Sequence, residues 1–92
     1  MQKDKPKIVN IVATSELPTK LNLDKLFLEL DLDEKEYETE TYPALLAKTR
    51  NPRGHVTLYK NGKYIITGIS SIDDLEKVHS ILIEKLREVG AL

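Results

Sequence analysis

The chain contains no cysteine and no tryptophan, and its 92 residues include only one phenylalanine. The lack of cysteine excludes a disulfide framework and a thiolate metal site, and it favours a cytoplasmic protein. No apolar run approaches the ~18–20 residues that a membrane-spanning helix requires, so no membrane partner is expected. The N-terminus lacks the apolar segment of a secretion signal. A chain of this length is expected to form one domain around one core.

Motifs for catalysis are missing as well. Neither His55 nor His79 has a second histidine at metal-ligand spacing, and no nucleophile elbow or glycine-rich phosphate loop occurs. The acidic residues between positions 29 and 40 have the spacing of a solvated surface rather than that of a calcium loop. The sequence therefore predicts a protein that is not an enzyme and that needs no metal or other cofactor.

Charge is strongly segregated along the chain, although the formal net charge is only −1. Residues 24–40 carry eight acidic and two basic side chains, whereas residues 42–68 carry five basic side chains and no acidic one. Such segregation fits either two solvated surfaces of opposite sign or a surface that binds a polyanion. The basic stretch also contains Tyr42, Tyr59 and two turn signals, so it is the first candidate for a binding surface.

Periodicity predicts five strands and two helices. The strands are expected at residues 7–15, 36–41, 42–50, 55–60 and 63–69, and the helices at residues 22–30 and from 70 or 71 to about 89. Asn22 and a serine at 70 or 71 are the expected N-caps, and Gly90 is expected to end the last helix. Residues 1–6 are expected to be a flexible N-terminus ahead of a single domain, residues 7–92.

Two turn signals divide the basic stretch into strands. In the first, Asn51-Pro52-Arg53-Gly54, proline suits the second turn position and glycine the fourth. The second, Asn61-Gly62, decides which side chains share a face. A two-residue loop there would mix polar and apolar side chains on both faces, whereas a three-residue loop with a left-handed Gly62 separates them. We therefore expect Val56, Leu58, Tyr64 and Ile66 on one face, with His55, Thr57, Tyr59, Lys63, Ile65 and Thr67 on the other.

This order of elements predicts an α+β fold: a curved antiparallel five-stranded sheet with two helices on its convex face. The face without helices is expected to carry Asn10, Val12, Tyr42, Thr57, Tyr59, Ile65 and Thr67, with basic residues around it. An uncovered face with apolar and aromatic side chains is typical of a binding surface. Asn10 fits either an exposed edge position or an amide that binds a ligand edge, since asparagine is depleted in strands.

Several stretches together resemble one repeat of the TATA-box-binding protein family, in an archaeal-like form. These are the strand IVNIVAT, the pattern LPTKLNLDKL before the first helix, and EYETETYPALLAKTRNPRGHVTLYKNGKYIITG, which aligns without a gap. Each motif is weak alone, but their order and spacing cover nearly the whole chain. Members of the family bind the DNA minor groove with the concave sheet face, insert aromatic wedges between base steps and bend the duplex.

The resemblance implies a DNA-binding role for ten residues. Asn10 would read minor-groove acceptors of A·T-rich DNA, and Tyr42 and Tyr59 occupy the wedge positions. Val12, Ile65 and Thr67 would form the flat contact surface, beside Thr57, which replaces a larger apolar residue. The positions of Lys48, Arg53 and Lys63 imply phosphate contacts.

The chain also departs from the family pattern. The wedges are tyrosine rather than phenylalanine, and only one repeat is present where the family has two. A homodimer paired through the strand at residues 7–15 would rebuild the two-repeat saddle. We therefore expect a transcription-related DNA-binding homodimer, with transcription factors as candidate partners. The alternatives are a protein-interaction module that keeps the fold without binding DNA, and an accessory substrate-binding domain of a larger nucleic-acid enzyme.

Overall fold

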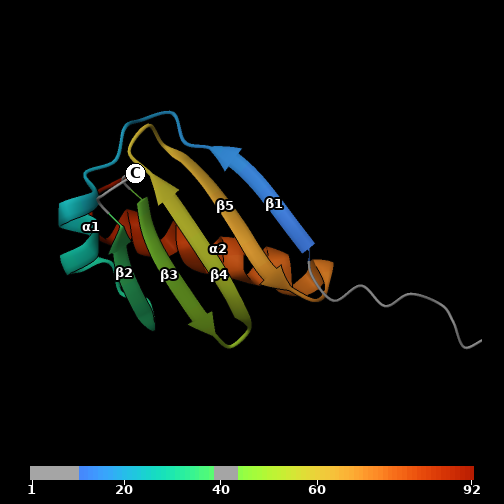
Figure 1. The fold of residues 1–92 in the computed structure, drawn as a ribbon. Helices are drawn as coiled ribbons and strands as arrows, with labels where there is room; N and C mark the ends of the chain where they lie inside the picture. Colours follow the sequence, from blue (N-terminus) through green and yellow to red (C-terminus); the bar gives the residue numbers. More distant parts are fainter. Residues whose placement is uncertain (1–10, 39–43) are drawn as a thin grey trace, which may run out of the picture.

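The computed structural model describes residues 11–38 and 44–92 (Figure 1). Predictions for residues 1–10 and 39–43, including Asn10, Tyr42 and the expected flexible N-terminus, lie outside the described residues. The elements follow the predicted order, strand, helix, four strands, helix: β1 (Ile11–Glu16), α1 (Leu23–Glu29), β2 (Glu34–Glu38), β3 (Ala44–Arg50), β4 (Arg53–Tyr59), β5 (Lys63–Ile69) and α2 (Ile72–Glu88).

The five strands form one antiparallel sheet in the order β1-β5-β4-β3-β2, with both helices packed on the same face (Figure 1). The fold class is therefore α+β, as predicted. β1, the first strand of the chain, lies at one edge of the sheet, and β2 lies at the other. In the described part of the chain, no helix combines the length and apolar character that crossing a bilayer requires.

The predicted three-residue loop between β4 and β5 is confirmed. Thr57 pairs with Ile65 and Leu58 with Tyr64, which leaves residues 60–62 as the loop. Gly62 has φ +98°, and its N–H donates to the Tyr59 carbonyl at 3.0 Å. As a result, the four apolar side chains expected on one face are all buried: Val56, Leu58, Tyr64 and Ile66.

The turn between β3 and β4 lies one residue earlier than predicted. Arg50 pairs with Arg53, so the loop consists of Asn51 and Pro52, and β4 begins at Arg53 rather than at residue 55. Gly54 is therefore a buried strand residue and not the fourth residue of a turn. A Cβ atom at Gly54 would lie 2.8 Å from Ile69 Cδ1, so glycine is needed here for close packing against the core.

The start of β2 also differs from the prediction. The strand begins at Glu34 rather than at residue 36, because Glu34 pairs with Lys48 and Lys35 with Ala47. The cross-strand pair of opposite charges, Glu34 and Lys48, stabilises this extension. Tyr37 points to the helix-covered face, where its ring lies 5.9 Å from that of Phe27.

Both helices are capped as predicted. The Asn22 side chain accepts a hydrogen bond from the Lys25 N–H at 3.2 Å, and Ser71 Oγ accepts one from the Asp74 N–H at 3.1 Å. At the end of α2, Gly90 has φ +78°. The Gly90 and Ala91 N–H groups donate to the Arg87 and Leu86 carbonyls, which is the Schellman arrangement that satisfies the last carbonyls of a helix.

The core lies between the sheet and the two helices. Leu23, Leu26 and Leu30 enter it from α1 and its end, while Val78, Leu82 and Leu86 enter it from α2, at helical spacing. Phe27, also on α1, is 37% exposed. The helices therefore cover one face of the sheet only, and the other face has no layer over it among the described residues.

The conformation of Gly62 yields a first prediction. Alanine at a positive φ costs about 1–2 kcal/mol, and this cost should be common to Gly62→Ala and the control Gly90→Ala. At Gly62 the added Cβ would also lie 2.5 Å from the Thr19 carbonyl oxygen, whereas at Gly90 it meets no atom within 4 Å. Urea denaturation should therefore show the larger loss of unfolding free energy for Gly62→Ala. Equal losses for the two variants would contradict this packing.

Candidate nucleic-acid interface

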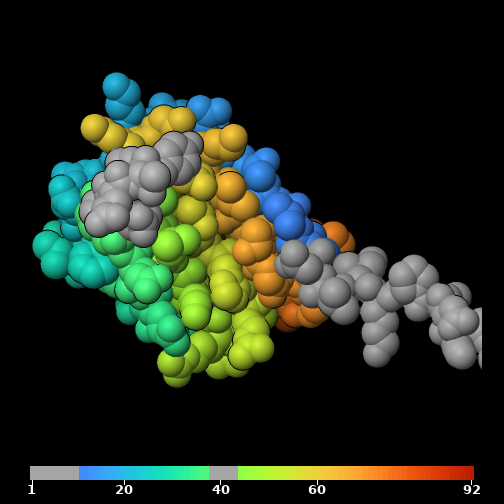
Figure 2. All heavy atoms as spheres, in the orientation of Figure 1, coloured from blue at the N-terminus to red at the C-terminus, as the bar shows by residue number. Residues whose placement is uncertain are grey.

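The outer face, defined as the sheet face without helices, is built by strand alternation. Each strand sends every second side chain to the core and the intervening ones outward, because successive side chains point to opposite faces. The described outer side chains are Val12, Thr14 and Glu16 from β1; Lys63, Ile65 and Thr67 from β5; Arg53, His55, Thr57 and Tyr59 from β4; Leu46, Lys48 and Arg50 from β3, with the buried Ala44 at its start; and Glu34 and Glu36 from β2. In Figure 2 this face is turned to the viewer, with α2 behind it.

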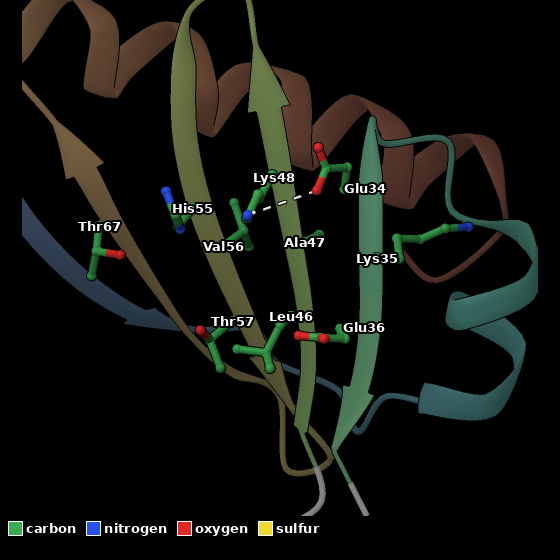
Figure 3. A pocket seen from close by; sticks show the side chains of 10 residues that line it. All are labelled: Glu34, Lys35, Glu36, Leu46, Ala47, Lys48, His55, Val56, Thr57 and Thr67. Carbon is green, nitrogen blue, oxygen red and sulfur yellow. Dashed lines mark ion pairs between the residues drawn. The ribbon is translucent and has the colours of Figure 1, made fainter.

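Register places the outer side chains in rows across the sheet (Figure 3). One row crosses four strands with polar and charged groups, in the order Glu34, Lys48, His55, Thr67. The next row is uncharged in its centre and runs Glu36, Leu46, Thr57, Ile65, Thr14. A hollow of about 370 Å³ opens over these two rows between β2 and β5.

A bulge at Gly68 shapes the end of the face next to β1. Between the pairs Ile11–Ile69 and Ala13–Ile66, β5 has one residue more than β1, and Gly68 takes the positive φ of +72° that such bulges use. The extra residue returns Ile69 to the core while Thr67 stays outside, so Val12 lies opposite Thr67 and Gly68. A Cβ at Gly68 would lie 2.7 Å from His55 Cδ2, so glycine also leaves room for the His55 ring.

Charges on the outer face are unevenly distributed. Glu34, on the edge strand β2, lies between two cations: its Oε1 is 3.7 Å from Lys48 Nζ and its Oε2 is 3.5 Å from Arg50 Nη2. Lys63 lies opposite Glu16 in register, at the far side of the sheet. Among the described residues, no ion pair within 4 Å joins Arg53 or Lys63 to an acidic group.

The eight predicted site residues that the structure describes all lie on the outer face. These are Val12, Lys48, Arg53, Thr57, Tyr59, Lys63, Ile65 and Thr67. Val12 is 58% exposed, which is high for a valine in a strand. Thr57, Tyr59, Ile65 and Thr67 are half-buried, and Thr57 and Thr67 line the hollow over the centre of the face. Asn10 and Tyr42 are outside the described residues.

Two ionisable groups with displaced pKa values lie on the helix side of the sheet. Loss of hydration, and then the neighbouring Asp24 carboxylate, raise the pKa of Tyr37. The Asp31 carboxylate, which accepts a hydrogen bond from Lys85 Nζ at 3.2 Å, raises the pKa of Lys85. Within residues 11–38 and 44–92, no group of histidine and acidic side chains is arranged to hold a metal ion.

Comparison with known proteins agrees with the sheet geometry. The sequence model of the family described as "Transcription factor TFIID (or TATA-binding protein, TBP)" matches residues 5–89. The chain belongs to this family. The TATA-box-binding protein of Archaeoglobus fulgidus is 37% identical over 86 residues, which are 94% of this chain and 47% of that protein. The Thermococcus kodakarensis TATA-box-binding protein is 35% identical, over 99% of this chain and 47% of its own.

A solved structure of the TBP family has the same fold. The Methanococcus jannaschii TBP superposes with a TM-score of 0.80 at 34% identity, and the match covers 90% of this chain and 48% of that one. The present chain thus spans about half the length of the TBP-family proteins it matches. Its five-stranded sheet with two helices corresponds to one half of such a protein.

The outer side chains that were not predicted as site residues include Leu46, Arg50, His55 and Glu34. Leu46 is 38% exposed on the outer face, and the alternation of β3 around the buried Leu45 and Ala47 would have indicated this. Glu34 could not be found in this way. Its position beside Lys48 and Arg50 depends on the pairing of β2 with β3, which the predicted strand boundaries had missed.

Neighbouring isoleucines on opposite faces of β5 provide a second prediction. Ile66 is 1% exposed and lies in the core, so Ile66→Ala should lower the unfolding free energy by about 2–5 kcal/mol. Ile65→Ala, on the outer face, should cost less than about 1 kcal/mol. Thermal and urea unfolding of the two variants would measure this difference. A cost at Ile65 as large as that at Ile66 would show that the outer face is packed against something in the free protein.

Proposed function

We propose that the outer face binds double-stranded DNA in the minor groove, in a role related to transcription. The observation that carries this proposal is the bare sheet face itself: its centre is uncharged, and Arg53 and Lys63 lie towards opposite ends of the strands, in a chain of the TBP family. The relatives that match it are named for binding the TATA box.

The chemistry of the face suits a minor groove. That groove offers mainly acceptor atoms and sugar surfaces, which a flat surface of hydroxyl and aliphatic side chains can contact over a wide area. Thr57, Ile65 and Thr67 provide this surface at the centre of the sheet, with Val12 beside them. Lys63 and Arg53 lie towards opposite ends of the strands, where they can reach phosphates on the rims of the groove.

Tyr59 is the proposed wedge of the described part. It is the last residue of β4, half-buried, and shares the outer face with Thr57. An aromatic ring at the end of the uncharged surface is suited to partial insertion between base steps, which kinks the duplex. The resemblance to the family assigns the second wedge to Tyr42 and the central minor-groove contact to Asn10.

We further propose that two copies pair through β1 to form the DNA-binding unit. β1 is an edge strand and the chain spans about half of the TBP-family proteins it matches. Pairing of two β1 strands around a two-fold axis satisfies the edge hydrogen-bonding groups of both copies. It also makes the two outer faces continuous, with each Val12 close to the centre.

A second candidate function is an interaction module that binds a protein instead of DNA. The observation that favours it is the acidic β2 edge, where Glu34 forms ion pairs with Lys48 and Arg50 and where Glu36 adds a further negative charge. An acidic margin opposes contact with phosphates. Binding experiments with duplex DNA separate the two functions.

The proposal predicts binding to A·T-rich duplexes in preference to G·C-rich ones. Gel shifts across a salt series should show affinity falling with a slope of about −0.9 per neutralised phosphate. Tyr59→Ala should weaken binding on the order of tenfold, because aromatic contacts with bases are worth about 1–3 kcal/mol.

The matched control is Leu28→Ala, since Leu28 is 78% exposed on α1, away from the outer face. This variant should bind like the original protein. Absence of binding to either duplex at low salt would contradict the proposal. A protein partner that is retained by Tyr59→Ala would then support the interaction module.

A further inference from the structure

A second, more basic hollow lies at the end of the outer face, beside the turn between β3 and β4. It has a volume of about 720 Å³ and is lined by Lys48, Arg50, Arg53 and His55, together with Glu34. Three of these side chains are permanently cationic at neutral pH, and they come from two adjacent strands, β3 and β4. Such convergence of lysine and arginine suits one phosphate group, since guanidinium and ammonium donors can contact its oxygens together.

One anionic side chain already occupies this hollow. Glu34 reaches it from β2, where it pairs in register with Lys48, and each of its carboxylate oxygens faces a different cation. The contacts are 3.7 Å to Lys48 Nζ and 3.5 Å to Arg50 Nη2, and Figure 3 shows the first of them. The Glu34 side chain is 55% exposed, so water and solute ions can reach the ion pairs.

We infer that this hollow binds one backbone phosphate of DNA through Lys48 and Arg50, and that Glu34 is an internal anion competing with that phosphate. The inference rests on the proposed function and extends it: it adds Arg50 to the phosphate-contacting residues and gives Glu34 a role in setting affinity. Lys48, assigned to a phosphate by the family resemblance, is then available only when the Glu34 carboxylate moves aside.

Magnitudes decide how strong this competition is. Ion pairs this exposed are individually weak, so a phosphate can displace the carboxylate. Glu34 nevertheless stays attached to β2 after it is displaced, and its charge remains close to the incoming phosphate. Glu34, Lys48 and Arg50 together keep a net charge of +1, so Glu34 reduces phosphate binding without abolishing it. Glu34 should also make the fall of affinity with salt less steep, because the protein then neutralises less phosphate charge.

Glu36 is a matched control for the charge of Glu34. It lies two residues further along the same strand, on the same face, and carries the same charge. Its register partner is Leu46, and within the described residues no ion pair joins it to a cation. Glu36→Gln therefore reports the general effect of removing one negative charge from the β2 edge, whereas Glu34→Gln reports that effect and the loss of competition.

The test measures binding of the original protein, Glu34→Gln and Glu36→Gln to an A·T-rich duplex and to immobilised heparin, over a salt series. We expect Glu34→Gln to bind the duplex about fivefold more tightly at low salt, and Glu36→Gln to gain clearly less. The salt slope of Glu34→Gln should be steeper by about 0.9, which is the value of one additional phosphate. In a Lys48→Gln/Arg50→Gln background the gain from Glu34→Gln should fall to that of Glu36→Gln.

The two polyanions distinguish failure of this inference from failure of the proposed function. Equal gains in affinity for Glu34→Gln and Glu36→Gln, on both the duplex and heparin, would overturn the inference that Glu34 competes with a phosphate. This holds even if the protein binds the duplex. A gain in affinity specific to Glu34→Gln on heparin, without any duplex binding, would show that Glu34 competes with a bound anion at this hollow. It would overturn the proposed function and, with it, the assignment of that anion to a DNA phosphate. Circular dichroism and urea unfolding of each variant establish that the fold is retained.

Discussion

Leu58 and Leu82 have no exposed surface and Ile66 has almost none, because β4 and β5 pack against α2 through these side chains. Burial of one face of the sheet fixes the register of every strand, since a slip by one residue would move the whole apolar set to the solvent side. The three-residue loop that ends at Gly62 sets this register between β4 and β5. The composition of the outer face is therefore a direct consequence of the packing of the inner one.

Sequence reasoning predicted the parts of the fold that depend on local patterns. The Asn22 cap, the end of α2 at Gly90 and the faces of β4 and β5 depend on residues close together in the chain. The roles of Gly54 and Gly68 were missed because they depend on distant neighbours. Gly54 makes room for Ile69 in the core, and Gly68 forms the bulge opposite Val12 and leaves space for the His55 ring.

For the candidate site, the sequence predicted which side chains share the outer face, but not how their charges are paired. Alternation placed Thr57, Ile65 and Thr67 on a common face, and the resemblance to the TBP family gave that face a ligand. The charge of the face was harder to predict, because the basic stretch at residues 42–68 is separate in sequence from the acidic stretch at residues 24–40. Pairing of β2 with β3 brings the two stretches together, so that Glu34 lies between Lys48 and Arg50. The positive charge of the surface proposed to bind DNA is thus partly neutralised by Glu34 of the same chain.

The proposed DNA-binding unit depends most on the edge strand β1, since a single chain corresponds to only half of the TBP-family proteins that match it. The most direct test is the solution mass by multi-angle light scattering, with and without an A·T-rich duplex. We predict a protein mass of about 21 kDa in the complex, which is twice the chain mass of 10.5 kDa, with two chains bound to one duplex. A protein mass of 10.5 kDa in the presence of the duplex, with or without DNA bound, would contradict the account.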